Sequence, residues 1–115
     1  MKPGEVYMAD FESAGRHPVI VVSREDLNRG RYVLVVVCTS ARFSTRKVLA
    51  NCVPFLAGEF SFTADCVAQC ENMVSIEKTD IINPDDGPIG ILDEIKLRDV
   101  IKSIGYVMES GCEPE

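Results

Sequence analysis

The residues most suited to chemistry in this sequence of 115 residues lie at the ends of two apolar runs. Arg16 and His17 stand directly before the run 18–23, and Thr39 ends the run 32–39. If the two runs pair as antiparallel strands, the numbers of opposite residues add up to about 55, within roughly two positions. The pairing therefore predicts that Arg16, His17 and Thr39 meet at one rim of a sheet.

These three side chains suit a phosphodiester. The guanidinium of Arg16 can hold a phosphate through two parallel hydrogen bonds, Thr39 offers a hydroxyl donor, and His17, the only histidine, can take up and release a proton. RNA cleavage without a metal needs only such groups, because the 2′-hydroxyl of the substrate attacks the phosphorus. A single histidine and scattered carboxylates form no recognisable ligand set, so we expect neither a metal nor another cofactor.

The polar loop after Thr39 has the character of a nucleic-acid surface. Its relevant residues are Ser40, Arg42, Phe43, Arg46 and Lys47. The cations can hold backbone phosphates, and the ring can stack on a base. Taken singly, each of these residues is better explained as an ordinary solvated side chain. Their expected convergence with the three residues above makes a binding site and an ordinary surface equally good explanations of the group.

The charge is distributed unevenly along the chain. The formal net charge is −6, which taken alone disfavours nucleic-acid binding. Residues 1–50 hold eight Lys or Arg and five Asp or Glu, a net of +3, whereas residues 51–115 hold four and thirteen, a net of −9. Such asymmetry suggests one side that faces a polyanion, although a solvated acidic half explains it equally well.

The cysteines indicate a reducing compartment. Cys38, Cys52, Cys66, Cys70 and Cys112 are odd in number and include no C-x-x-C pair, so neither a disulfide framework nor a zinc site is expected. The start of the sequence has no signal-peptide pattern, and no apolar run approaches the ~20 residues of a membrane helix. We expect reduced thiols and a cytoplasmic protein.

The apolar pattern predicts one mainly β domain over residues 1–115. Strands are expected over 4–11, 18–23, 32–39, 48–55, 66–71 and 73–77, and residues 89–92 form a brief apolar stretch. Asp93 is a good N-cap for a helix over 94–108, whose expected core residues are Ile95, Val100, Ile101, Ile104, Val107 and Met108. Short strands followed by one terminal helix favour a small, partly open antiparallel barrel of about six or seven strands.

The sequence resembles the MazF/PemK family of toxins from type II toxin–antitoxin systems. The similar segments are Pro3–Asp10, Ala14–Ser23, Val35–Ser40, Leu56–Glu59 and Asp65–Ile76, and their order and spacing cover residues 3–108. The resemblance implies an SH3-like barrel with a C-terminal helix, a homodimer, and metal-independent cleavage of single-stranded RNA. It also implies that a cognate antitoxin silences the activity.

Carried over by position, the family's loop arginine falls on His17, with Arg16 one place earlier, and its strand-end threonine falls on Thr39. Gln69 and Glu71 lie where some members have an arginine and an aspartate. The first loop is about six residues shorter than is common in the family, and Val74 stands where an arginine is frequent.

The leading hypothesis is therefore an endoribonuclease toxin. Arg16 would stabilise the phosphorane with help from Thr39, His17 or Glu71 would move protons, and the loop after Thr39 together with Gln69 would bind RNA. The alternative is a non-catalytic relative that acts as an RNA- or protein-binding regulatory module, which the acidic balance favours. A gyrase-directed relative ranks last, because that mode depends on a C-terminal tryptophan and this sequence has none.

Overall fold

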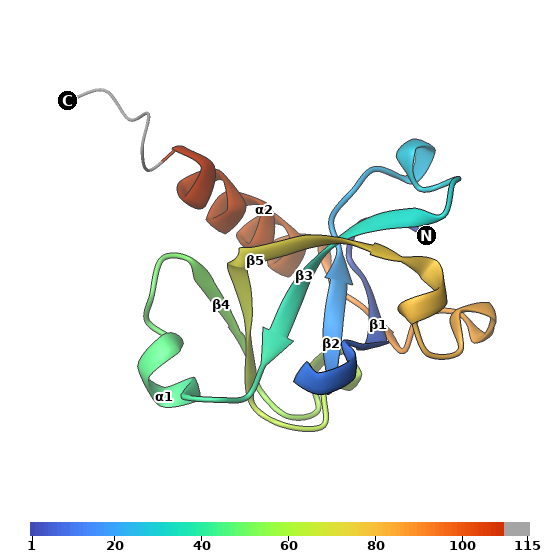
Figure 1. Ribbon diagram of the computed structural model, residues 1–115. Helices are drawn as coiled ribbons and strands as arrows, with labels where there is room; N and C mark the ends of the chain where they lie inside the picture. Colours follow the sequence, from blue (N-terminus) through green and yellow to red (C-terminus); the bar gives the residue numbers. More distant parts are fainter. Residues whose placement is uncertain (110–115) are drawn as a thin grey trace.

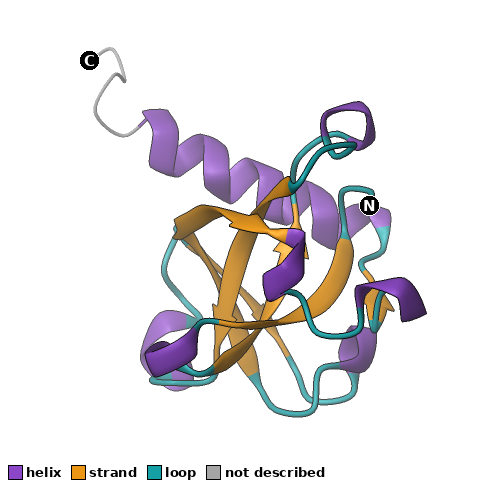
Figure 2. Cartoon of the chain, turned by 45° about the vertical axis from the view of Figure 1, so that its right-hand side comes forward, coloured by secondary structure: helices purple, strands orange, loops and turns teal. Residues whose placement is uncertain are grey.

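Six strands form one curled antiparallel sheet, with a long helix against it, in a computed structural model that describes residues 1–109 (Figure 1). In sheet order the strands are β4 (Cys52–Phe55), β5 (Cys66–Glu77), β3 (Tyr32–Thr39), β2 (Arg16–Val21), β1 (Glu5–Asp10) and β6 (Gly90–Ile91). The helix α2 (Glu94–Glu109) lies across the curled sheet (Figure 2). Shorter helical turns are η1 (Glu12–Ala14), η2 (Glu25–Leu27), α1 (Phe43–Arg46), η3 (Glu59–Ser61), η4 (Lys78–Asp80) and η5 (Pro84–Asp86). The prediction of a mainly β half-barrel with a C-terminal helix is confirmed.

The sheet is buried on both faces, which explains its nearly continuous apolar runs. Val6 of β1 and Ile20 of β2 belong to the core cluster that packs against α2. Their neighbours Tyr7, Val19 and Val21 belong to a second cluster on the opposite face. Because successive side chains of a strand point to opposite faces, the strands β1, β2, β3 and β5 contribute to both clusters.

The helix α2 begins where the sequence predicts. Oδ1 of Asp93 accepts a hydrogen bond of 2.8 Å from the backbone N–H of Lys96, which is the expected N-cap. The residues that pack against the sheet are Leu97, Val100, Ile104 and Val107.

Three residues expected in the core of α2 are exposed instead. The exposed fractions are 72% for Ile95, 47% for Ile101 and 64% for Met108. The prediction was wrong for them because a helix turns by about 100° per residue. Leu97 and Val100 fix the inward face, so Ile101 and Met108 lie to one side of it and Ile95 lies on the outward face.

The outer edge of β4 is covered by two side chains of α2. Nζ of Lys96 donates a hydrogen bond of 3.0 Å to the carbonyl oxygen of Pro54, and Oγ of Ser103 donates one of 2.7 Å to the carbonyl oxygen of Ala50. The strand predicted over 48–55 starts only at Cys52, because residues 47–51 form turns. The edge of the sheet at β4 is thus closed by the helix.

The two strands predicted over 66–71 and 73–77 are one long strand, β5, with an irregularity in its pairing to β3. Val36 lies opposite Met73, whereas the next residue, Val37, lies opposite Gln69. Residues 70–72 are therefore inserted as a bulge between two regular stretches, and a bulge re-aims nearby side chains.

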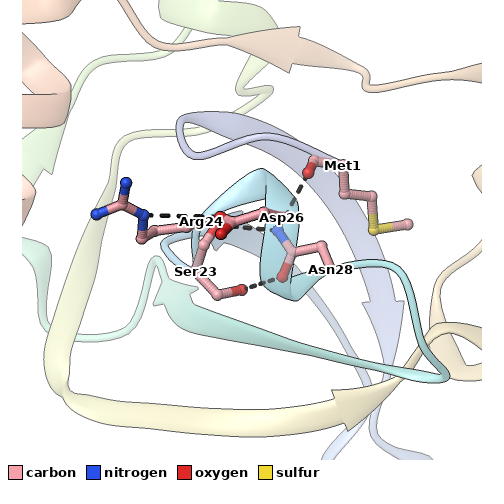
Figure 3. A network of polar contacts seen from close by, with 5 residues as sticks. All are labelled: Met1, Ser23, Arg24, Asp26 and Asn28. Atoms are coloured by element: carbon pink, nitrogen blue, oxygen red, sulfur yellow. Dashed lines mark hydrogen bonds and ion pairs between the residues drawn. The ribbon is translucent and has the colours of Figure 1, made fainter.

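A polar network anchors the N-terminal end of the chain to the connection between β2 and β3 (Figure 3). Asn28 is buried, and its Nδ2 donates to the carbonyl oxygens of Met1 at 3.1 Å and Ser23 at 2.9 Å. Oγ of Ser23 donates to Oδ1 of Asn28 at 2.5 Å, and Nζ of Lys78 donates to the carbonyl oxygen of Asn28. The side-chain amide is satisfied on both its donor and its acceptor.

The described cysteines are free thiols, as expected. They are Cys38, Cys52, Cys66 and Cys70, all of them buried, and Cys112 lies outside the described residues. Within residues 1–109, every helix is too short or too polar to cross a bilayer.

Candidate nucleic-acid interface

The pairing of β2 with β3 brings Arg16, His17 and Thr39 to the same end of the sheet. Val19 lies opposite Val37, which is one residue from the expected sum and within the expected range. Since Arg16 begins β2 and Thr39 ends β3, the two strands deliver these residues to one rim. All three line a cavity of about 240 Å³.

We call this cavity the Arg16 pocket. Its walls come from β1, from the starts of β2 and β5, from the end of β3 and from the loop after η3. The lining residues are Met8, Arg16, His17, Pro18, Cys38, Thr39, Ser40, Phe62, Thr63, Ala64 and Cys66. The thiols of Cys38 and Cys66 contact each other there, and the hydrogen bond with Cys66, together with burial, raises the pKa of Cys38 well above its usual value. Arg16 is the only lysine or arginine among the described residues that line this pocket, so the formal positive charge there comes from its guanidinium.

Arg16 is held loosely. Its Nε lies 4.0 Å from Oδ2 of Asp10, and its side chain is 67% exposed. An exposed ion pair at this distance contributes little to stability. The guanidinium can therefore turn its donors towards an anion in the pocket without a large cost.

His17 is held by its own loop. Nε2 lies 2.9 Å from the carbonyl oxygen of Ala14, and the ring lies against that of Phe11, with 6.1 Å between the centroids. Because a carbonyl oxygen only accepts, Nε2 must carry a proton and donate it. In the neutral ring Nδ1 is then the nitrogen that can accept a proton.

Thr39 is oriented as a donor. Its Oγ1 accepts a hydrogen bond of 3.2 Å from the backbone N–H of Ala41, which fixes the oxygen at the end of β3. The hydroxyl hydrogen can therefore be given to a ligand. Ser40, the next residue, also lines the Arg16 pocket.

A second cavity, of about 260 Å³, adjoins the first. We call it the amide pocket, and its lining residues are Phe11, Ala14, His17, Val37, Thr39, Gln69, Asn72 and Val74. His17 and Thr39 line both cavities, so they form the ridge between them. The sequence indicated Gln69 but missed Phe11 and Asn72. Asn72 was missed because the bulge that places it leaves no signal in the apolar pattern.

The basic loop after Ser40 forms the short helix α1 beside these cavities. Arg42 precedes the helix in a left-handed conformation, with φ of 54°. Nζ of Lys47 lies 5.7 Å from the ring centroid of Phe43, and Nη1 of Arg46 donates to the carbonyl oxygen of Ala41 at 3.3 Å. None of these four residues lines either cavity. The structure places them on the surface that continues from Ser40.

Glu71 is not brought to the ridge. Its Oε1 accepts a hydrogen bond of 2.8 Å from Nδ2 of Asn51, and its Oε2 accepts a long one of 3.4 Å from Nε2 of Gln69. Glu71 lies within the bulge of β5 and lines neither cavity. Of the two residues expected to move protons, only His17 lies beside Arg16 and Thr39.

Comparison with known proteins points to one family. A family model described as "PemK-like, MazF-like toxin of type II toxin-antitoxin system" matches residues 2–108. No curated protein matches the sequence at a significant level.

Solved structures share the fold at low sequence identity. The Mycobacterium tuberculosis toxin MazF-mt6 is 22% identical with a TM-score of 0.73, over 91% of this chain and 96% of that one. An endoribonuclease in complex with its cognate antitoxin, from a mycobacterial species, is 17% identical with a TM-score of 0.76, over 100% and 99%. A chain of the MazE–MazF complex from Deinococcus radiodurans is 16% identical with a TM-score of 0.70, over 94% of both. At such identities the likeness shows a common fold.

Proposed function

The chain belongs to the PemK-like, MazF-like toxin family, and on that premise we propose that it is an endoribonuclease toxin. The proposed substrate is single-stranded RNA, cleaved without a metal ion at short sequences, and the proposed antagonist is a cognate antitoxin. The observation that carries the proposal is the meeting of Arg16, His17 and Thr39 at one cavity.

The proposed reaction uses the substrate as its own nucleophile. Nδ1 of His17 takes the proton of the 2′-hydroxyl while the bond between O2′ and phosphorus forms. Arg16 and the hydroxyl of Thr39 stabilise the negative charge that grows on the phosphoryl oxygens. The bond from phosphorus to O5′ then breaks, which leaves a 2′,3′-cyclic phosphate and a 5′-hydroxyl that takes its proton from solvent.

The surface around α1 would hold the flanking RNA. Arg42, Arg46 and Lys47 are close in sequence to Ser40 at the mouth of the Arg16 pocket, and Phe43 offers a half-buried ring among them. Cations of this kind contact phosphates regardless of sequence, and a ring can stack on any base. Residues 1–50, which include α1, carry a formal net charge of +3, whereas residues 51–115 carry −9.

We also propose that the toxin acts as a homodimer in the cytoplasm. The mass of one chain is 12.7 kDa, so light scattering at micromolar concentration should give about 25 kDa. A mass equal to that of one chain would refute the dimer.

The second candidate is a non-catalytic module that binds RNA or protein. The observation in its favour is the carboxylate of Asp10, which lies beside Arg16 and competes with a phosphate for the guanidinium. In that case RNA would bind without being cut.

Incubation of the purified chain with single-stranded RNA in EDTA tests the proposal. We expect fragments that end in a 2′,3′-cyclic phosphate, and a loss of about a hundredfold or more in rate for Arg16→Ala or Thr39→Ala. Arg29→Ala is the matched control, because Arg29 is an exposed arginine in the connection at the opposite end of β2 and β3. Binding without cleavage by the parent chain would favour the second candidate.

A further inference from the structure

We propose that the amide pocket binds an adenine base beside the scissile phosphate, an inference that rests on the proposed function. The pocket combines apolar walls with two carboxamides, which are those of Gln69 and Asn72. Base recognition in single-stranded RNA uses this combination, in which a flat apolar contact holds the ring and polar groups read its edges.

The bulge in β5 creates the pair of carboxamides. Residues three apart in a regular strand point to opposite faces, so Gln69 and Asn72 would normally be separated by the sheet. The pairing jumps from Val37 opposite Gln69 to Val36 opposite Met73, and the inserted residues turn the chain between them. Both carboxamides consequently line one cavity.

The two carboxamides are available to a ligand. Among the described residues, none makes a hydrogen bond to the side chain of Asn72, which is exposed. Nε2 of Gln69 makes only the long contact of 3.4 Å to Glu71. Each carboxamide offers one oxygen acceptor and an N–H donor, so the pair can make two bidentate contacts.

Adenine matches two carboxamides better than the other bases do. Its exocyclic amine has two hydrogens, one beside the acceptor N1 and one beside the acceptor N7, so each edge can pair with one carboxamide. Guanine is read best by Arg or Lys, and neither residue type lines this pocket. A pyrimidine has only one such edge and would leave one carboxamide unpaired.

The apolar walls of the amide pocket and its position beside the Arg16 pocket also suit a base next to the scissile phosphate. Phe11 offers a ring face, and Val37 and Val74 offer apolar contacts. Because His17 and Thr39 line both cavities, a base in the amide pocket lies next to a phosphate in the Arg16 pocket. The same ridge therefore couples the choice of base to the position of cleavage.

Binding of four 2′-O-methyl pentanucleotides that differ only in the central base, A, G, C or U among uridines, tests the proposal. Their blocked 2′-oxygens prevent cleavage, so fluorescence anisotropy measures affinity alone. We expect the adenine probe to bind about tenfold more tightly than the others. We expect Gln69→Ala and Asn72→Ala each to remove most of that preference. Ser75→Ala, an exposed position on the same strand outside this pocket, should retain it.

Probes with 1-deazaadenine and 7-deazaadenine locate the two contacts. Each should bind about tenfold more weakly than adenine in the parent chain, because each lacks one ring acceptor. Equal binding of all four natural probes, or an adenine preference unchanged in both variants, would overturn the inference.

The cleavage assay separates this inference from the proposed function. Cleavage without base preference in the binding assay overturns the adenine site and leaves the endoribonuclease standing. Preferential binding of the adenine probe without cleavage of natural RNA supports the base site and overturns the endoribonuclease.

Discussion

Nε2 of His17 lies 2.9 Å from the carbonyl oxygen of Ala14, so the turn η1 fixes the ring of the residue that follows it by three positions. The sequence alone placed His17 at the rim, but it could not show which ring nitrogen donates a hydrogen bond to the backbone. The contact assigns the donor role to Nε2 and leaves Nδ1 as the ring nitrogen that can accept a proton.

This contact leads to the first prediction. In His17→Gln the side-chain amide can still donate to Ala14, but the chain no longer has a base at the ridge. We expect the cleavage rate to fall by about a hundredfold or more, with RNA affinity nearly unchanged. The cleavage rate and the affinity of the parent chain and of His17→Gln, both measured on the same RNA, test this prediction. An equal loss in rate and in affinity would show that His17 only binds the RNA.

The second prediction concerns the cations around α1. Replacing Arg42, Arg46 and Lys47 with glutamine should weaken RNA binding for all sequences alike. The slope of log affinity against log salt should flatten by about 0.7 for each phosphate that the protein no longer neutralises. Titrations at several salt concentrations measure this slope. The control replaces Arg24 and Arg29, which lie near η2, with glutamine. An equal change of the salt slope in this control would contradict an RNA-binding surface confined to the region around α1.

The third prediction concerns the wall of the Arg16 pocket. A Cβ on Gly90 would overlap the carbonyl oxygen of Phe60, and that residue already has a strained φ of 48°. We expect Gly90→Ala to destabilise the fold by roughly 2 kcal/mol and to slow cleavage, because the segment leads directly into Phe62. Gly30→Ala, where a Cβ meets nothing within 4 Å, should be nearly neutral in urea unfolding. Equal midpoints for the two variants would contradict the prediction.

The fourth prediction compares the buried and exposed parts of the network in Figure 3. Asn28→Ala removes a buried amide with partners on both sides, and we expect a loss of about 2 kcal/mol. Arg24 and Asp26 form an ion pair beside it, with 3.6 Å between Nε and Oδ1, but both side chains are exposed. Asp26→Ala should therefore lower the free energy of unfolding by less than about 0.5 kcal/mol. Urea unfolding of both variants measures the difference, and similar losses would contradict it.

The fifth prediction concerns alkaline pH. Burial and the hydrogen bond of 2.9 Å from its hydroxyl to Oε1 of Glu5 raise the pKa of Tyr7 to about 12. In the unfolded chain tyrosine ionises near pH ~10, so folding stability is lost as the pH rises from about 10 to about 12. The loss specific to Tyr7 should reach about 2 kcal/mol and be absent in Tyr7→Phe. The free energy of unfolding of the parent chain and of Tyr7→Phe, measured at pH ~9 and ~11.5, checks the sign. An equal change in the two proteins between these pH values would refute the prediction.

The sequence predicted the architecture because the fold is encoded in local patterns. The β-branched runs around Val19 and Val36 indicated a sheet buried on both faces, and Asp93 marked the start of α2. The register could be predicted only to within about two residues, since a run that is apolar on both faces does not distinguish its two sides. The inward face of α2 was misjudged at Ile95 for a similar reason, because several apolar residues compete for one stripe.

The candidate site was predictable only in part. The rim formed by Arg16, His17 and Thr39 follows from strand order and length. Asn72 could not be found in this way, because its position depends on a bulge, and a bulge arises from pairing with β3 and not from the local sequence of β5. The separation of Glu71 from the ridge has the same cause.

The covered edge of β4 has a consequence for self-association. An uncovered edge strand offers a template on which another extended chain can add, and such addition starts fibril growth. Here Lys96 and Ser103 occupy two carbonyl oxygens along that edge or next to it. A segment that tried to extend the sheet at β4 would first have to displace α2 from the core. The helix that completes the hydrophobic core thus also protects the chain against ordered aggregation at that edge.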